Sequence, residues 1–368
     1  MEQYLDAEFW KIMSNCTNVN STVNTGRSIN TKAKEIERFI GASILMSTIG
    51  YPRLRMFWQK SLRISAVADV ISRTRYFQIR SNLKVVIDLD VPDEMKAVDR
   101  LWKVRPIMDR VRVRCLQQDR CRDVSVDEQM ISFSGASPAC RYVPNKLNPI
   151  GFKKFVLASS TGIVLDFIVD QGVATYHVIP DEFRVGVGGA VIAHLAESLH
   201  RGSQLYCDRY FTSLPLIDYM LKEHGVHVTG TVMKNRIPTE IRQLSDDREL
   251  VRKGRRSCEL TVRKDNKITL VKWLDKKPIL LASFLHSTNP ADKCRRWSKK
   301  DKRYIQVERP HIVREYNANM GGVDLCDRML SFYRIKARTK KWTVRTILYF
   351  IDLAIVNSWL QHRNECFA

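Results

Sequence analysis

One stretch of this chain, residues 123–232, changes its apolar pattern in an order that constrains the fold more than any other feature. Residues 123–133 alternate like a strand, and two β-rich runs joined by a Ser-Ser-Thr-Gly turn follow as a hairpin. A helical run, a short strand at 204–207, a second helical run and a last alternating segment complete the series. Strands interleaved with helices in this way predict an α/β fold, with a mixed sheet flanked by helices.

The segments on either side of this core predict further units. Residues 1–122 carry apolar side chains mostly at helical spacing, whereas 233–305 are polar and basic with short β-like runs and indicate a β-rich insertion. In 306–332 a Gly-Gly pair precedes a helical pattern that would close the core, and 333–368 contain one last amphipathic helix. The RNase H-like arrangement is the best-known fold with this order of core elements.

The charge is large and unevenly distributed. The chain has 61 basic and 39 acidic residues, a net charge of +22. Residues 1–122 hold 22 basic and 13 acidic side chains, 123–232 hold 8 and 11, and 233–305 hold 21 and 9. A polyanion is the natural partner of such a surface. No apolar run approaches the ~18 residues that a bilayer helix needs, so no membrane partner is expected.

Four aspartates stand where they can serve one chemical purpose: Asp127, Asp208, Asp324 and Asp327. Asp127 interrupts an apolar strand, where Asp is disfavoured, and Asp208 directly follows the strand at 204–207. If these two strands pair, both side chains emerge at the same edge of the sheet. Asp324 and Asp327 are three residues apart and lie on one helical face. Carboxylates are ligands for Mg²⁺, which leaves its other positions to water and phosphate.

Each aspartate also has an ordinary structural explanation. An Asp at a strand end is often a turn or cap residue, and carboxylates in the first turn of a helix often complement its dipole. The residues alone therefore indicate only a possible metal-dependent nucleic-acid enzyme.

A second candidate feature is the segment 328–345, which has seven basic residues and no acidic one. Its cations can contact phosphates, and an indole among them can stack on an unpaired base or anchor a helix interface. The candidate DNA contacts here are Arg334, Lys336, Arg338, Lys340, Lys341, Trp342 and Arg345. The basic runs 252–256 and 299–303 are DNA contacts, a nuclear address or solvated loops.

Six strings of this chain resemble the piggyBac transposase family, and together they cover nearly its whole length. They are DRLWKVRPIMDRV (99–111), VSVDEQMISFSG (124–135), RYVPNKLNPIGFK (141–153), CDRYFTSLPL (207–216), REYNANMGGVDLCDRM (314–329) and SFYRIKARTKKWTVRTILYFIDLAIVNSWL (331–360).

The resemblance implies an RNase H-like catalytic core interrupted by a β-rich insertion, with the N- and C-terminal segments packing together as a dimerisation and DNA-binding unit. It also implies cut-and-paste transposition at TTAA-flanked DNA, with Asp127, Asp208 and Asp324 holding Mg²⁺ or Mn²⁺ and Asp327 as a fourth catalytic carboxylate. Double-stranded DNA, a second copy of the chain and a nuclear location follow as expectations. Lys153, Lys154 and Arg209 join the expected DNA contacts.

Two of the chain's departures from the family pattern bear most on its activity. Arg209 stands where the family usually has Asn, and its guanidinium either competes with a metal or grips a phosphate. Family transposases commonly end in a cysteine-rich zinc finger, whereas the nine cysteines here contain no C-x-x-C pair, so no zinc site is expected. Two hypotheses follow: a metal-dependent DNA transposase, or a domesticated or truncated DNA-binding protein without transposition activity.

Overall fold

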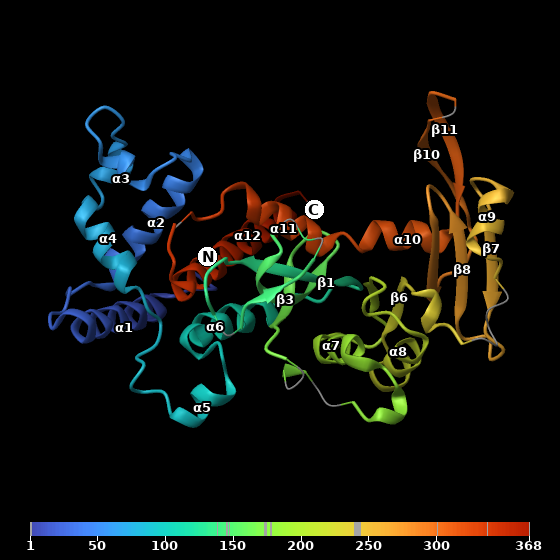
Figure 1. Cartoon of the computed structure of the whole chain (residues 1–368), viewed down its shortest axis with the longest axis horizontal. Helices are drawn as coiled ribbons and strands as arrows, with labels where there is room; N and C mark the ends of the chain where they lie inside the picture. Colours follow the sequence, from blue (N-terminus) through green and yellow to red (C-terminus); the bar gives the residue numbers. More distant parts are fainter. Residues whose placement is uncertain are drawn as a thin grey trace.

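A computed structural model describes residues 2–137, 139–144, 146, 148–172, 175–176, 179–238, 244–299, 301–336 and 338–367. Its centre is a nine-stranded mixed sheet that lies between two sets of helices (Figure 1). The expected α/β class, a mixed sheet with helices on both faces, is therefore confirmed.

The strands of this sheet are β1 (Asp123–Ser132), β2 (Arg141–Tyr142), β3 (Ile150–Ser159), β4 (Val164–Val169), β5 (Gln204–Cys207), β6 (His227–Thr231), β7 (Cys258–Val262), β8 (Thr269–Leu274) and β9 (Pro278–Ser283). Their order is β2-β3-β1-β5-β6-β9-β8-β7, and β4 pairs with β3. β1 runs antiparallel to β3 and parallel to β5, which runs parallel to β6. The predicted hairpin turn connects β3 to β4, and Gly162 adopts the positive φ that it requires.

The two faces of the sheet are buried by different helices. One face packs with α7 (Gly186–Ala196) and α8 (Leu214–Tyr219), and the other with α6 (Arg105–Leu116), α11 (Gly322–Phe332) and α12 (Trp342–Phe367). Strand β1 contributes side chains to both faces because successive side chains alternate. Val126 packs in the hydrophobic cluster with α7 and α8, and Ile131 packs in the cluster with α6, α11 and α12.

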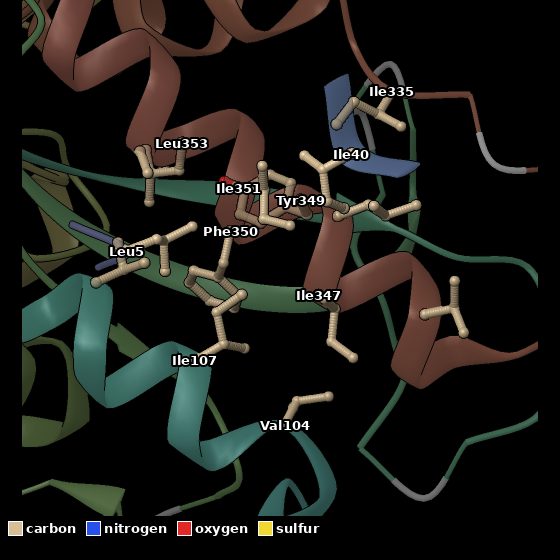
Figure 2. Close-up of a cluster of buried hydrophobic side chains, with 14 of the residues drawn as sticks. Leu5, Ile40, Val104, Ile107, Ile335, Ile347, Tyr349, Phe350, Ile351 and Leu353 are labelled. Atoms are coloured by element: carbon tan, nitrogen blue, oxygen red, sulfur yellow. The ribbon is translucent and has the colours of Figure 1, made fainter. Parts of the chain in front are cut away.

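The N-terminal segment is helical, as predicted, and lies beside the C-terminal helix. Its elements are α1 (Ala7–Thr25), α2 (Ala33–Ile49), α3 (Ser65–Ala68), α4 (Arg73–Asn82) and α5 (Asp93–Val98), with short 3₁₀ turns at Leu54–Trp58 and Trp102–Val104. Figure 2 shows Leu5, Ile107 and Phe350 meeting in one buried cluster. The Nδ2 of Asn357 also donates to the hydroxyl of Tyr4 at 3.2 Å. The two ends of the chain therefore form one packed unit.

The segment 233–305 is β-rich, but most of it continues the central sheet. Strand β9 pairs antiparallel with β6, and β8 and β7 follow it. The strands β10 (Asp292–Ser298) and β11 (Arg303–Arg309) form a separate two-stranded sheet, which continues past residue 305. The chain then returns to the core through α10 (His311–Asn319) and α11. Helix α9 (Asp247–Lys253) precedes β7.

Most predicted elements appear within a few residues of their expected ends. Strand β5 occupies 204–207 as predicted, and Ser213 caps α8 by accepting from the backbone N–H of Leu216. Helix α6 begins at Arg105, where Pro106 favours the first turn, and a 3₁₀ turn precedes it. The ribbon β10–β11 was not expected.

Helix α12 is long and apolar enough to cross a bilayer by length and composition alone, with a mean hydropathy of 1.2. In this structure 67% of that stretch is buried inside the chain, as in the core helix of a globular domain. Its buried residues, among them Phe350 and Ile351, belong to the cluster of Figure 2.

Asp352 is a buried carboxylate of α12 that gives the fold a pH dependence. It accepts from the backbone N–H of Ile335 at 3.1 Å, and burial raises its pKa to about 7. Since the folded protein holds this proton more tightly than the unfolded chain, the free energy of unfolding falls as pH rises from about 4 to about 7. Asp352→Asn keeps an acceptor, so we expect it to stabilise the protein at pH 8 by about 2–4 kcal/mol and to flatten this dependence.

Urea unfolding at pH 5 and pH 8 measures the effect, with Asn at the exposed Asp181 as the control. An Asp352→Asn protein that loses stability at pH 8 would contradict the assignment of this group.

Candidate active site

Asp127 and Asp208 come together at one edge of the parallel part of the sheet. Val126 of β1 pairs with Cys207 of β5 in parallel register, so the next residue on each strand is one of the two aspartates. Neighbouring strands lie ~4.8 Å apart, and paired positions of parallel strands point to the same side. The pairing inferred from the sequence is confirmed, and both side chains are partly buried.

The loop that follows Asp208 is fastened by hydrogen bonds. The carboxylate of Asp208 accepts from the backbone N–H of Tyr210 at 2.8 Å, which closes a tight turn. One nitrogen of Arg236, Nη1, donates to the backbone carbonyls of Arg209, Tyr210 and Thr212 at 2.9–3.1 Å. A guanidinium that joins three carbonyls fixes the path of this loop and hence the position of Asp208.

Two glycines let neighbouring elements approach the same loop. A Cβ on Gly230 of β6 would lie 2.1 Å from Oγ1 of Thr212, and one on Gly188 of α7 would lie 2.9 Å from the carbonyl oxygen of Tyr210. Only glycine fits at such distances.

Helix α11 brings Asp324 and Asp327 to this edge. Its first residue, Gly322, packs so closely on the sheet that a Cβ would lie 2.1 Å from the carbonyl oxygen of Ser159 and 3.0 Å from Oγ of Ser125. Asp324 therefore sits in the first turn, just above β1 and β3, and is exposed. Positive charge at the helix N-terminus favours a carboxylate there.

Asp327 is held by a chain of hydrogen bonds that crosses the sheet face. The Nε2 of Gln129 on β1 donates to Oδ1 of Asp327 at 3.1 Å. The Oε1 of the same amide accepts from the hydroxyl of Tyr349 on α12 at 2.5 Å. Asp327 is thus oriented by side chains, while its second oxygen remains available.

Mutual repulsion marks the carboxylates as one electrostatic group. Burial, with smaller contributions from the Asp208 and Asp324 carboxylates, raises the pKa of Asp127 to about 6 against the opposing effects of the Glu128 backbone N–H and Lys146. Burial and Glu128 likewise raise the pKa of Asp208. Such a set of hard oxygen donors, carrying excess negative charge, matches the preference of Mg²⁺ or Mn²⁺. Among the described residues, no three His, Cys, Asp or Glu side chains are close enough to hold a metal by themselves.

Glu128, the residue after Asp127, was not singled out from the sequence. Its carboxylate lies 3.2 Å from Nζ of Lys153 and 3.7 Å from that of Lys146. Lys153 also lies over the rings of Phe155 and Tyr210, at 4.7 and 4.6 Å. These lysines place positive charge beside the aspartates.

Two neighbouring cavities open beside these aspartates and share Ser132 and Asn148 as a wall. The first, which we call the acidic cavity, has a volume of about 420 Å³ and is lined by Asp324, Asp327, Glu128, Lys146, Arg328 and Arg334, among others. The second, the basic cavity, has a volume of about 750 Å³ and is lined by Lys336, Arg338, Lys340 and Arg345, among others. A cavity that carries carboxylates therefore lies next to one that carries cations.

The residues expected to contact DNA differ in how exposed they are. Arg209, Lys336, Arg338, Lys340 and Lys341 are exposed. Arg334 and Arg345 are partly buried and donate to Oγ and the carbonyl of Ser132 at 3.3 Å, and burial lowers the pKa of Arg345 to about 10. The Nη2 of Arg334 is buried without a hydrogen-bond partner in the described part of the chain. A phosphate oxygen in the acidic cavity would satisfy it.

Lys154 and Trp342 have different positions from those expected of DNA contacts. The assignment of Lys154 to DNA is wrong, because its side chain is fully buried on the face of β3 opposite to Lys153. Its ammonium lies 5.0 Å from the ring of Phe167 and 4.9 Å from that of Tyr349, and burial lowers its pKa to about 8. Trp342 packs against the core, 5.6 Å from the ring of Phe152, which favours its alternative role as an interface anchor.

Three further residues were missed by sequence reasoning. Tyr316 of α10 has a pKa raised by burial and by the nearby Asp208 and Asp127 carboxylates, so its phenol lies beside the site. Phe332 and Tyr333, 55% and 64% exposed, end the helix that carries Asp324. Exposed aromatic rings next to cations are available to stack on bases.

Known proteins resemble this chain over nearly its whole length. The family model described as Transposase IS4 matches residues 2–359. Human PiggyBac transposable element-derived protein 3 is 29% identical over 99% of this chain and 60% of its own length. Human PiggyBac transposable element-derived protein 2 is 32% identical over 91% of this chain and 56% of its own. The chain thus spans about three fifths of these relatives.

One solved structure has the same fold. It is that of piggyBac transposase in a synaptic complex with hairpin DNA, which superposes with a TM-score of 0.80 at 24% sequence identity. The match covers 98% of this chain and 73% of that one.

Proposed function

The chain belongs to the Transposase IS4 family, in its piggyBac type, and from this premise we propose that it is a DNA transposase that cleaves and rejoins strands at TTAA-flanked ends. The observation that carries the proposal is the placement of Asp127 and Asp208 on paired parallel strands, with Asp324 near enough to raise the pKa of Asp127. Asp324 also lines the acidic cavity, together with the cations of Lys146 and Arg334.

We further infer that the first six strands form an RNase H-like core. Strand β1 is central, with the antiparallel β3 and β4 on one side and the parallel β5 and β6 on the other. Ligands bind beyond the carboxyl ends of parallel strands in open α/β sheets. Asp208 lies at such an end, and Asp127 is its neighbour on β1, which supports a catalytic role for this edge.

In the proposed reaction the residues of this chain bind and orient the DNA. Asp127, Asp208 and Asp324 would hold Mg²⁺ or Mn²⁺, with Asp327 in support. A bound ion of this kind lowers the pKa of an attacking hydroxyl and stabilises charge on the phosphodiester. Arg334, with its unpartnered Nη2, would hold a phosphate oxygen.

The remaining DNA contacts extend away from the aspartates. Lys336, Arg338 and Lys340 line the basic cavity. A DNA duplex bound across these cations would place one of its strands at the acidic cavity. Exposed Arg209, next to Asp208, would contact a phosphate close to the reacting one.

We also propose that the protein works as a homodimer in the nucleus. The region around α5 exposes Leu89 (83%) and Val98 (85%), apolar side chains that a second copy could cover. The basic run 252–256 is suited to a nuclear address.

A second candidate function is DNA binding without transposition. It is favoured by Arg209, whose charge lies beside Asp208, and by the lack of a preformed cluster of three metal ligands within the described residues. Under this hypothesis the chain would bind duplex DNA with or without a divalent ion and would leave it intact.

A cleavage assay distinguishes the transposase from the DNA-binding protein without transposition activity. The protein is incubated with labelled duplexes carrying TTAA-flanked ends, with Mg²⁺, Mn²⁺ or EDTA, and binding to the same duplexes is measured in parallel. Metal-dependent nicking at TTAA, lost when TTAA is changed to TATA, is expected. Binding without nicking in either metal would support the non-enzymatic function instead.

A further inference from the structure

The ribbon β10–β11 is a separate structural element, fixed firmly at its base. It forms its own two-stranded sheet and projects from the body of the molecule (Figure 1). Cys294 and Val307, on its inner face, are buried against Val271 and Trp273 of β8. Inward-facing Arg296 donates to Asp275 at 2.9 Å. The ribbon is therefore a supported arm whose outer face is free.

Hydrogen bonds from side chains to backbone carbonyls of the ribbon add to this support. Indole Nε1 of Trp273 donates to the carbonyl of Glu308 at 3.1 Å. Arg255 and Arg256 donate to the carbonyls of Trp297 and Gln306 at 3.2 and 3.0 Å. Each contact fixes the inner side or the backbone, and none of them covers the outer side chains.

The outer face carries an aromatic pair flanked by cations. Trp297 and Tyr304 are direct partners across the two strands, with ring centroids 5.2 Å apart, and they are 46% and 56% exposed. The guanidinium of Arg295 lies 4.0 Å from the Tyr304 ring. Lys293 comes next along the same face of β10. Large exposed aromatics are uncommon on a surface that has no partner.

The charge of the ribbon is strongly positive. Residues 292–309 contain eight basic and three acidic side chains. Asp292 is paired with Arg309, and Asp301 accepts from the hydroxyl of Ser298, so two of the three acids are engaged within the ribbon. No ion pair to Lys293, Arg295, Lys302 or Arg303 is formed in the part of the chain that the structure describes. Lys300 of the predicted basic run lies outside the described residues.

The dimensions of the ribbon match those of a DNA groove. Two strands of seven residues each span about 24 Å in length. The major groove of B-DNA is ~12 Å wide and admits a two-stranded ribbon. Cations on the outer face would reach the phosphates, and the aromatic pair would contact base edges or thymine methyl groups.

We propose that the outer face of β10–β11, formed by Lys293, Arg295, Trp297 and Tyr304, is a second binding surface for double-stranded DNA. It is separate from the cavities beside the aspartates, since none of its residues lines them. The inference rests on the proposed function only in taking DNA as the partner. A duplex would then contact one molecule at two places, the outer face of the ribbon and the cavities beside the aspartates.

The test measures DNA binding rather than cleavage. Fluorescence anisotropy compares the intact chain with Lys293→Ala/Arg295→Ala and with Trp297→Ala/Tyr304→Ala, on a 30-base-pair duplex and on the matching single strand. Each double variant is expected to bind the duplex about tenfold more weakly. The first is also expected to reduce the slope of log affinity against log salt by about 2, because each phosphate contact contributes ~0.9.

The matched control is Lys276→Ala/Lys277→Ala, which removes the same charge from the exposed turn between β8 and β9 of the central sheet. If the control weakens binding as much as the ribbon variants do, the effect is general charge and the proposal is overturned. Unchanged duplex binding by both ribbon variants also overturns the proposal, and would indicate that the outer face binds a protein partner instead. A loss confined to the single strand would assign the face to unpaired DNA instead.

Folding and function are controlled separately. Circular dichroism melts establish that the variants fold, and a charge reversal at the exposed Lys302, Lys302→Glu, gives an independent perturbation that is expected to weaken duplex binding. Ribbon variants that bind weakly support the proposal even if the intact chain cuts no DNA. Ribbon variants that bind and cut as the intact chain does would refute the second surface and leave the proposed transposase activity standing.

Discussion

Replacing Asp127 with Asn is expected to reduce metal-dependent strand cleavage at TTAA-flanked DNA by a factor of about 1,000 or more. The change removes one negative charge from the partly buried edge where Asp208 and Asp324 also lie. Loss of a metal ligand costs several kcal/mol of transition-state stabilisation, and ~1.4 kcal/mol corresponds to each tenfold change in rate. DNA affinity should stay within about twofold, because the cations proposed to contact phosphate remain in place.

Cleavage rates under single-turnover conditions and anisotropy on the same duplex give the two readouts. We expect Asn at Asp208 or Asp324 to act like Asn at Asp127, and Asn at Asp327 to have a smaller effect because that side chain is engaged with Gln129. Asp119→Asn, at an exposed position, is the control with the same chemical change. Cleavage that persists in the Asp127→Asn protein would exclude the assigned site.

The meeting of Asp127 and Asp208 was predictable because it depends on strand order and period. An apolar alternation identifies β1 and β5, and a parallel pairing brings the residues after Val126 and Cys207 to one edge. Similarly, Asp324 follows a Gly-Gly pair and a helical pattern, and α11 starts at Gly322. Local periodicity was sufficient for these residues because each occupies a fixed position in a regular element.

Other positions depend on contacts that a sequence does not record. Lys153 and Lys154 are neighbours on β3, so the strand turns them to opposite faces, and only the packing of α11 and α12 shows which one is inside. Arg236 acts through three backbone carbonyls that are 24–27 residues away. The ribbon β10–β11 was missed because its inner face contains Arg296 beside Cys294, so it lacks an apolar alternation.

Gly322→Ala is expected to lower the free energy of unfolding by about 2–3 kcal/mol. Its Cβ would lie 2.1 Å from the carbonyl oxygen of Ser159, a backbone atom at the end of β3 that cannot move without breaking its pairing with β1. Helix α11 must therefore shift away from the sheet, which loosens the buried Val323 and Cys326. Since Asp324 lies two residues further along the helix, it moves with them.

Gly321→Ala is the matched control, because a Cβ there meets nothing within 4 Å, and its cost should stay within about 1 kcal/mol. Urea unfolding measures stability, and cleavage at a temperature where both variants are folded measures the displacement of Asp324. We expect Gly322→Ala to lose both stability and cleavage, and Gly321→Ala to keep cleavage near that of the intact chain. Equal stability of the two variants would show that α11 does not need this close approach, and the placement of Asp324 beside Asp127 would then have to rest on other contacts.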